Sequence, residues 1–182
     1  MESYVALLRG INVGGKNIIP MAELAQCFTA AGYRDVRTYI QSGNVLFRHD
    51  PAPGNRVAAL EAELEALLEA TLQTSVMVVV RTHAQLREIV VAAPSTHGSP
   101  ERRSDVIFLK YPHRTEEVFA QFPPLRAEVD EAKIGDGVIY FSRLDAQASK
   151  SRLNRVVGKA IYQEMTIRNW RTTTRLLKLL EE

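Results

Sequence analysis

Short β-rich runs alternate with amphipathic stretches over the first 82 residues, and their order limits the fold more than any other feature of the sequence. Apolar runs too short for a helix predict strands, whereas apolar residues spaced three and four apart predict helices. The predicted strands lie at residues 4–8, 36–41, 44–48 and 76–80, and the predicted helices follow Pro20 and Val57. This β-α-β-β-α-β order is typical of a ferredoxin-like fold, in which two helices cover one face of a four-stranded antiparallel sheet and leave the other open.

The rest of the chain nearly repeats this order. Thr82 and Gln85 have the spacing of a capping box, a strand is predicted at residues 106–111, and residues 135–137 join a second hairpin. Two basic amphipathic helices follow, one over residues 153–161 and one that ends near residue 180. We therefore expect an α+β protein of two ferredoxin-like subdomains with antiparallel sheets, residues 1–82 and residues 83–182, the second of which ends in a basic helical segment.

Two details of the first subdomain follow from its pattern. A turn centred on Ser42-Gly43 makes Gln41 face Asn44, Tyr39 face Leu46 and Arg37 face Arg48 across the first hairpin. In the helix after Val57 the leucines form one stripe. This predicts that Glu61, Glu65 and Glu69 lie on the solvent side of that helix.

Composition excludes several classes of protein. With 182 residues, 46% hydrophobic, the chain is long and apolar enough to bury a core, unlike a disordered protein. The single cysteine, Cys27, forms no internal disulfide. No apolar run approaches the roughly 20 residues that span a bilayer, and the N-terminus lacks the pattern of a signal peptide. We therefore expect a cytoplasmic protein without a membrane partner.

Charge is concentrated at the C-terminal end. The net charge of the chain is only +2, yet residues 150–182 contain eight basic and three acidic side chains. In the last predicted helix, Arg171, Arg175 and Lys178 lie opposite the leucine stripe. Such a basic face suits the phosphates of a nucleic acid or a nucleotide. The alternative is a solvated surface that balances acidic helices elsewhere.

The loop between residues 10 and 17, which follows the first strand, has part of the spacing of a P-loop. Gly10, Gly15 and Lys16 have the Walker A spacing, but Asn17 replaces the hydroxyl residue that binds Mg²⁺, and the next helix starts only near Pro20. No Walker B aspartate follows an apolar strand. Two interpretations stay open: a plain glycine turn, and a loop whose N–H groups bind an anion together with Arg9 and Lys16.

Signatures of catalysis and metal binding are absent from the sequence. The four histidines have no metal-ligand spacing, Cys27 lies on the buried stripe of its helix, and neither a G-x-S-x-G nor an H-E-x-x-H motif occurs. We therefore predict no metal and no cofactor. An enzyme is not the favoured reading, although catalytic groups that meet only in space leave no sequence pattern.

Three strings carry a resemblance to a known family. With LLRGINVGGKN at residues 7–17, TYIQSGNVLF at 38–47 and TIRNWRT at 166–172, the whole chain resembles the bacterial family called domain of unknown function 1697. The resemblance implies an α+β protein with ferredoxin-like subdomains and no established activity. Ile167 departs from the motif, in which a second threonine is usual. The motif residues that transfer to this chain are Arg9, Gly10, Asn12, Gly14, Gly15, Lys16, Asn17, Gln41, Ser42, Gly43, Asn44, Arg168, Asn169 and Trp170.

The motif residues provide amides, guanidinium groups and backbone N–H donors with hardly an acid, which suits anion binding better than acid–base catalysis. The strand-1 loop, the first hairpin turn and the start of the last helix are therefore predicted to converge on one site. This site is expected to bind a phosphate-bearing ligand, either a nucleic acid or a nucleotide, through three kinds of residue. Arg9, Lys16 and Arg168 provide charge; Gly14 and Gly15 allow close approach; and Gln41, Asn44 and Asn169 provide hydrogen bonds.

Two residues near the last helix have particular predictions. Asn169 is expected to be the N-cap, so that Arg168 projects beside the free N–H groups of the helix. Trp170 falls on the apolar side, where a core position is expected more than a stacking platform. Two alternatives to the phosphate site stay open. In one, the motifs determine the fold and the partner is another protein; in the other, the protein is an enzyme for a small anionic substrate.

Overall fold

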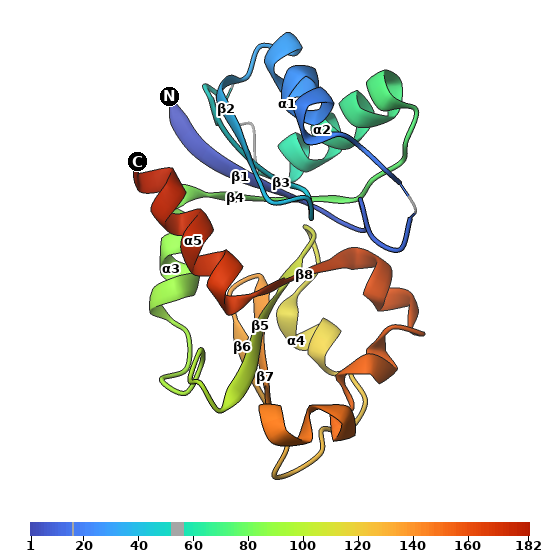
Figure 1. Ribbon diagram of the computed structural model, residues 1–182, viewed down its shortest axis with the longest axis vertical. Coiled ribbons are helices and arrows are strands. Elements are labelled where there is room, and N and C mark those ends of the chain that lie inside the picture. The colour runs from blue at the N-terminus through green and yellow to red at the C-terminus, as the bar shows by residue number, and fades with distance from the viewer. Residues whose placement is uncertain (16, 52–56) are drawn as a thin grey trace. The chain divides into compact units, whose positions relative to one another are not determined.

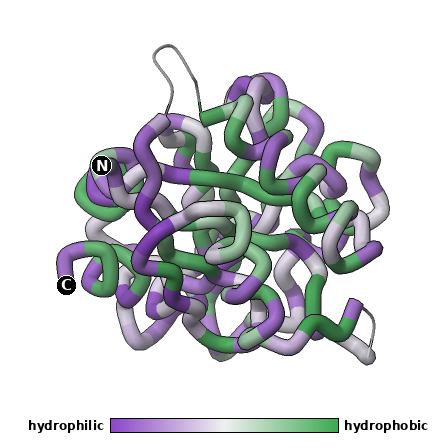
Figure 2. The backbone as a smooth tube through the Cα atoms, turned by 90° about the horizontal axis from the view of Figure 1, so that it is seen from above, coloured by the Kyte–Doolittle hydropathy of each residue, from purple (hydrophilic) through white to green (hydrophobic). Residues whose placement is uncertain are grey.

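The computed structural model describes residues 1–15, 17–51 and 57–182 (Figure 1). The chain divides into two compact units: a first unit of Met1–Leu86 with Leu176–Glu182, and a second unit of Arg87–Arg175. Each contains one four-stranded antiparallel sheet, so the predicted α+β fold is confirmed. Hydrophobic and hydrophilic residues alternate in short stretches along the chain (Figure 2), as expected for strands and helices that bury one side.

The first unit has the predicted order of elements. These are β1 (Glu2–Leu8), α1 (Met21–Ala30), β2 (Arg34–Tyr39), β3 (Asn44–His49), α2 (Val57–Leu72) and β4 (Val78–Thr82). The sheet has the strand order β2-β3-β1-β4, with every neighbouring pair antiparallel. This is the ferredoxin-like arrangement that the sequence predicts.

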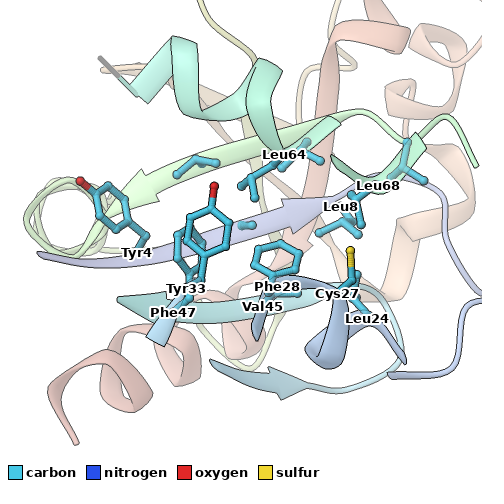
Figure 3. Packing of buried hydrophobic residues seen from close by; sticks show 14 of the residues in the cluster. Tyr4, Leu8, Leu24, Cys27, Phe28, Tyr33, Val45, Phe47, Leu64 and Leu68 are labelled. Carbon is cyan, nitrogen blue, oxygen red and sulfur yellow. The ribbon is translucent and has the colours of Figure 1, made fainter. Parts of the chain in front are cut away.

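The core of the first unit lies between its sheet and its two helices (Figure 3). Alternate residues of β1 enter it, because successive strand side chains point to opposite faces. The Phe47 ring lies 5.4 Å from Phe28 and 5.0 Å from Tyr33, both in edge-to-face contact. Residues from both helices complete the core, among them Leu24, Cys27, Phe28, Leu64 and Leu68.

The opposite face of this sheet is not open, which corrects the prediction. Val5, Leu7 and Val79 on this face are fully buried. The last turn of α5 (Trp170–Glu181) belongs to the same unit and is attached to β2. There Arg37 donates a hydrogen bond to the Leu179 carbonyl and lies 3.5 Å from the Glu182 carboxylate. Apolar residues on both faces of the sheet require such a cover.

The first hairpin differs from the predicted register. Tyr39 pairs with Asn44 and Arg37 with Leu46, two residues away from the expected alignment. The turn comprises residues 40–43, and both of its ends are left-handed, with φ of 49° at Ile40 and 79° at Gly43. A shift by two residues keeps every side chain on its predicted face, because strand side chains alternate with a period of two.

Glu61 and Glu65 of α2 bind the edge strand β4. Their carboxylates accept hydrogen bonds from the backbone N–H groups of Val80 and Val78, each at 2.9 Å. Glu61 is fully buried, and its Oε1 lies 3.5 Å from Nη1 of Arg81. The predicted solvent position of Glu61 is therefore wrong. The N–H groups on the outer side of β4 are not paired with another strand, and once they are buried they need acceptors, which Glu61 and Glu65 supply.

The second unit repeats the topology of the first, but the connection between its third and fourth strands differs from helix α2. It contains most of α3 (His83–Val91), then β5 (Arg102–Leu109), α4 (Thr115–Phe119), β6 (Asp130–Gly135), β7 (Val138–Leu144), β8 (Met165–Asn169) and the start of α5. The sheet order β6-β7-β5-β8 matches that of the first sheet, strand for strand. The second predicted hairpin is confirmed, since Gly135 pairs with Val138 across a two-residue turn.

One of the predicted helical features of the second half of the chain is confirmed and another is wrong. The capping box at the start of α3 is confirmed, because Thr82 N–H donates to Gln85 Oε1 at 3.0 Å and Gln85 N–H donates to Thr82 Oγ1 at 3.1 Å. The helix predicted over residues 153–161 is wrong. The segments between β7 and β8 are three short 3₁₀ helices, η1 (Asp145–Lys150), η2 (Leu153–Val156) and η3 (Ala160–Glu164). Gly158, a poor helix former, lies between the last two.

Within the described part of the chain, no helix has the length and hydrophobicity that crossing a membrane requires.

We predict that Arg81→Met lowers the free energy of unfolding by about 3–5 kcal/mol, because the carboxylate of Glu61 would stay buried without its guanidinium partner. Urea unfolding followed by circular dichroism measures the difference. Arg48→Met is the matched control: its ion pair with Asp35, 3.3 Å long, is half exposed, so its loss should cost less than about 1 kcal/mol. Equal, small losses in both variants would contradict a stabilising role for the Glu61–Arg81 pair.

Candidate functional site

Two of the three predicted segments meet in the first unit. The Asn12 amide donates hydrogen bonds to the carbonyls of Ile19, at 2.9 Å, and Gln41, at 3.0 Å, and its oxygen accepts one from the Ile19 N–H group. The backbone N–H of Leu8 donates to the Gly43 carbonyl at 2.8 Å. The strand-1 loop and the hairpin turn are therefore adjacent. Lys16, predicted to supply charge there, lies outside the described residues.

Several predicted ligand-binding groups in this region are used within the fold. The Asn44 side chain is fully buried and donates to the Tyr39 carbonyl at 2.9 Å and to Ser42 Oγ at 3.2 Å. A Cβ at Gly43 would lie 2.8 Å from side-chain atoms of Leu8 and Ile11. These positions hold the turn together. Gln41, Gly10, Gly14, Gly15 and Asn17 are exposed, and Arg9 is half-buried.

The third segment, residues 168–170, belongs to the second unit. Arg168 pairs with Val106 in the sheet and is buried, and its Nη1 donates to Thr166 Oγ1 at 2.8 Å and to the Ile167 carbonyl at 3.0 Å. Burial lowers the pKa of Arg168 to about 10. Arg168 is thus a buried residue of β8, and its predicted position beside the free N–H groups of α5 stays a prediction.

The predicted N-cap is confirmed. Asn169 Oδ1 accepts a hydrogen bond of 2.8 Å from the Thr172 N–H group, and α5 begins at Trp170. The strand β8 thus passes into α5 without a loop. Because the cap holds this junction, Asn169, Trp170 and Arg171 have defined positions.

Trp170 is half-buried against a loop of the same unit. Its ring centroid lies 4.9 Å from that of His97, with the planes nearly perpendicular, and a Cβ at Gly98 would lie 2.3 Å from Trp170 Cδ1. Gly98 also has a φ of 84°, so glycine is required there for two reasons. The indole is therefore fixed in place without being enclosed, which differs from the predicted core position.

His97 forms the buried side of this contact. It is buried, contacts Tyr140 edge-on at 5.7 Å, and its Nε2 has no hydrogen-bond partner among the residues that the structure describes. Burial lowers the pKa of His97, and this effect outweighs the nearby Asp105, which raises it. The imidazole is therefore neutral at pH 7.

A cavity of about 430 Å³ opens next to Trp170. It lies where β5 extends beyond β8: the last β8 pair is Asn169 with Asp105, whereas residues 102–104 pair only with β7. A second cavity, of about 470 Å³, adjoins it along Arg103 and Arg143, which line both. We call the two together the arginine groove. Its lining residues are Gly98, Arg102, Arg103, Ser104, Asp105, Arg143, Asn169, Trp170 and Arg171 in the first cavity, with Asp145, Ala146, Ala148, Ser149, Ser151 and Asn154 in the second.

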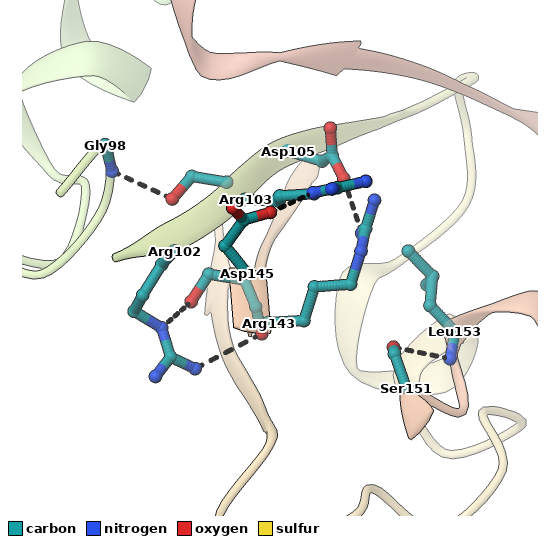
Figure 4. A network of polar contacts seen from close by, with 10 residues as sticks. Gly98, Arg102, Arg103, Asp105, Arg143, Asp145, Ser151 and Leu153 are labelled. Carbon is teal, nitrogen blue, oxygen red and sulfur yellow. Dashed lines mark hydrogen bonds and ion pairs between the residues drawn. The ribbon is translucent and has the colours of Figure 1, made fainter. Parts of the chain in front are cut away.

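Carboxylates hold the arginines of the groove (Figure 4). Arg103 and Arg143 are direct cross-strand partners, an arrangement in which like charges repel. Arg143 Nη1 lies 2.8 Å from Asp105 Oδ2, and Arg103 forms an ion pair with Asp145. Arg102 donates from Nε to Ser142 Oγ at 2.9 Å and lies 3.2 Å from Glu131. The three guanidinium groups are thus oriented before any ligand binds.

Arg171 adds an exposed cation at the other wall of the groove. It lies in the first turn of α5, which contains no acidic residue. A cation is unfavourable there, because the N-terminal end of a helix carries partial positive charge. A bound anion would offset that cost.

Most of these cations were not predicted as site residues. Arg171 was placed on a basic helix face, but Arg102, Arg103 and Arg143 become neighbours only through the pairing of β5 with β7. The adjacent arginines at 102 and 103 are the one local signal. Among the described residues no group of histidine, cysteine, aspartate or glutamate side chains is placed to hold a metal ion.

Asn12→Gly should lower the free energy of unfolding by about 1–3 kcal/mol, because it leaves the carbonyls of Ile19 and Gln41 without their donor. Glycine keeps the left-handed backbone of Asn12, whose φ is 55°, so the change isolates the side chain. Urea unfolding provides the measurement. Gln41→Gly, an exposed neighbour in the same turn, is the control. An unchanged midpoint for Asn12→Gly would show that these bonds do not hold the two segments together.

His97 should make stability depend on pH. Since the pKa of His97 is lowered in the folded state, the unfolded chain takes up a proton below the ordinary value of 6.5 while the folded chain does not. The free energy of unfolding should therefore fall below pH 6.5, by at most about 1.4 kcal/mol per pH unit from this group. The His97→Phe variant should have a smaller slope between pH 6.5 and 5. Equal slopes in chemical unfolding series of both proteins would rule out this contribution.

The comparisons with known proteins agree with this architecture. No curated protein matches the chain. A solved structure described as the conserved bacterial protein SP0830 from Streptococcus pneumoniae is 25% identical, with 98% of each chain covered and a TM-score of 0.81. The model of the family described as Protein of unknown function (DUF1697) matches residues 1–140. The predicted family is thereby confirmed over residues 1–140, and the chain belongs to this family.

Proposed function

We propose that the protein binds a phosphate-bearing ligand, a nucleic acid or a nucleotide, in the arginine groove of the second unit. The observation that carries the proposal is the meeting of Arg103, Arg143 and Arg171 at one cavity of about 430 Å³. That volume is in the range of small-molecule sites, which runs from roughly 300 to 1,000 Å³. Asn169 and Trp170, both predicted site residues, line the same cavity.

The chemistry of the lining suits a phosphate group. Guanidinium groups present planar pairs of N–H donors that match phosphate oxygens, and charge-assisted hydrogen bonds are about twice as strong as neutral ones. Among the described residues, four arginines line the two cavities, and carboxylates of Glu131, Asp145 and Asp105 pair with three of them, so that Arg171 supplies the excess charge. The groove therefore keeps an excess of positive charge after its internal ion pairs are formed.

The proposal changes the predicted set of site residues. Arg171 takes the role expected of Arg168, which is buried in β8. Asn12 and Asn44 are engaged within the first unit, which supports their alternative role as fold determinants. A role for Arg9, Gly14, Gly15 and Lys16 in ligand binding stays a prediction.

Exposed aliphatic side chains favour a second candidate function for the first unit, contact with a protein partner. Val13, Ile18 and Ile40 are 62%, 74% and 48% exposed, and they occur in the strand-1 loop region and the hairpin turn, which are adjacent. Exposed apolar groups that gather in this way often mark protein contacts. If the groove binds no phosphate-bearing probe, contact with a protein partner is the candidate to test next.

Arg171→Ala tests the proposed function directly. Loss of one charge-assisted bond should weaken the binding of pyrophosphate, ADP or a short single-stranded oligonucleotide by about tenfold or more. Stability of the free variant should change by less than about 0.5 kcal/mol, because the side chain is exposed. Thermal-shift titration and isothermal titration calorimetry measure the two effects.

The matched control for this experiment is Arg114→Ala. Arg114 is an exposed arginine of the same unit that precedes α4, beyond the other end of β5. It should leave affinity within twofold of the wild-type value. Binding that is weakened equally by both variants, or no binding of any probe, would contradict the proposed function.

A further inference from the structure

We infer that the arginine groove binds a single-stranded nucleic acid across two successive nucleotides, with a base against Trp170 and the intervening phosphodiester at Arg103 and Arg143. This inference rests on the proposed function and narrows it from phosphate-bearing ligands in general. Its basis is that the groove has two cavities of similar size with the arginine pair between them. A single nucleotide would use only one of them.

Trp170 provides the stacking surface in the first cavity. The indole packs against His97 and against the bare Cα of Gly98, and its remaining surface lines the cavity. Bases of any sequence stack on such a ring, because each has a π-face. Since the side chain is already fixed, ordering it costs little when a base arrives.

The arginine pair is suited to a phosphodiester because its two members differ in exposure. The Arg143–Asp105 pair is largely buried, with side chains 22% and 15% exposed, and orients one guanidinium permanently. The Arg103–Asp145 pair is 60% and 53% exposed, and such pairs contribute little in water. Arg103 therefore exchanges its carboxylate for a phosphate at small cost, and the phosphate also relieves repulsion between the two cross-strand arginines.

The second cavity offers neutral polar groups for the next nucleotide. It extends along η1 and the start of η2, where Ser149, Ser151 and Asn154 line it. Hydroxyl and amide groups hydrogen-bond to sugar and phosphate oxygens without sequence preference. Trp170 thus lines the first cavity, the guanidinium pair lines both, and neutral polar groups line the second, a combination that suits a single strand.

Trp170 is the only tryptophan in the chain, so its fluorescence reports occupancy of the first cavity without a label. The experiment titrates the full chain with thymidine monophosphate and with thymidine oligonucleotides of two, four and eight residues, and with matched uridine oligonucleotides. We expect quenching by all of them. Affinity should rise at least tenfold from the mononucleotide to the dinucleotide or tetranucleotide, and then level off.

Three variants assign the contacts, with Arg114→Ala again as the charge-matched control. Arg103→Ala should weaken tetranucleotide binding about tenfold and reduce the slope of log affinity against log salt by about 0.7, the value for one phosphate of a single strand. Ser149→Ala should weaken tetranucleotide binding and leave the mononucleotide unchanged. Trp170→Leu should weaken tetranucleotide binding about tenfold. Because this variant lacks the tryptophan signal, its binding is measured by the anisotropy of a labelled tetranucleotide. Arg114→Ala should keep the affinity for every probe within twofold of the wild-type value.

The outcomes separate this inference from the proposed function. If the mononucleotide binds as tightly as the tetranucleotide and both depend on Arg171, the proposed function stands and the extended strand is refuted. If oligonucleotides bind without quenching Trp170 and without dependence on Arg103, they bind elsewhere and the inference is overturned. If neither mononucleotide nor oligonucleotide binds, both fail. Thermal unfolding of each variant shows that it is folded.

Discussion

The antiparallel register of β5 between β7 and β8 is the constraint on which the candidate site depends. It sets Arg103 opposite Arg143 on one side and Asp105 opposite Asn169 on the other. Because β8 ends at Asn169, residues 102–104 pair only with β7 in the described part of the chain. The groove opens at that gap. A shift of this register by one residue would turn Arg103 to the opposite face and remove the site.

The two units show how one topology gives different surfaces. In the first unit the second crossover is the long helix α2, whose Glu61 and Glu65 bind the edge strand β4 and close it. In the second unit the equivalent crossover consists of the 3₁₀ segments η1, η2 and η3. Since those segments do not form a continuous helix, polar side chains of η1 and η2 remain available to line a groove.

Local patterns in the sequence predicted much of the fold. The order of elements, the capping box of Thr82 and Gln85, and the Asn169 cap each depend on residues within a few positions of one another, so the signal is complete in a short window. The register of the first hairpin was wrong, because a four-residue turn with left-handed ends has no strong signature. The position of Glu61 was predicted wrongly because its partner, the Val80 N–H group, lies on strand β4 and leaves no signal in the sequence of the helix.

The candidate site was predicted less well, for a physical reason. Asn169 and Trp170 line the groove as members of a motif, but Arg168 does not, because it pairs with Val106 one step further into the sheet and is buried there. Arg103 and Arg143 are far apart in the sequence and meet only through strand pairing. The distribution of charge along the sequence indicated the basic C-terminal end and Arg171. The Arg103–Arg143 pair could not be predicted in this way, because only the pairing of β5 with β7 brings the two residues together.

We propose that Arg103 and Arg143 form the phosphate site of this protein. A crystal structure of the chain with a thymidine dinucleotide tests it most directly. We expect the phosphodiester to lie within hydrogen-bond distance of Arg103 and Arg143, with one base stacked on Trp170. A dinucleotide bound instead at the glycines of the strand-1 loop would contradict it and restore the site predicted from the motifs alone.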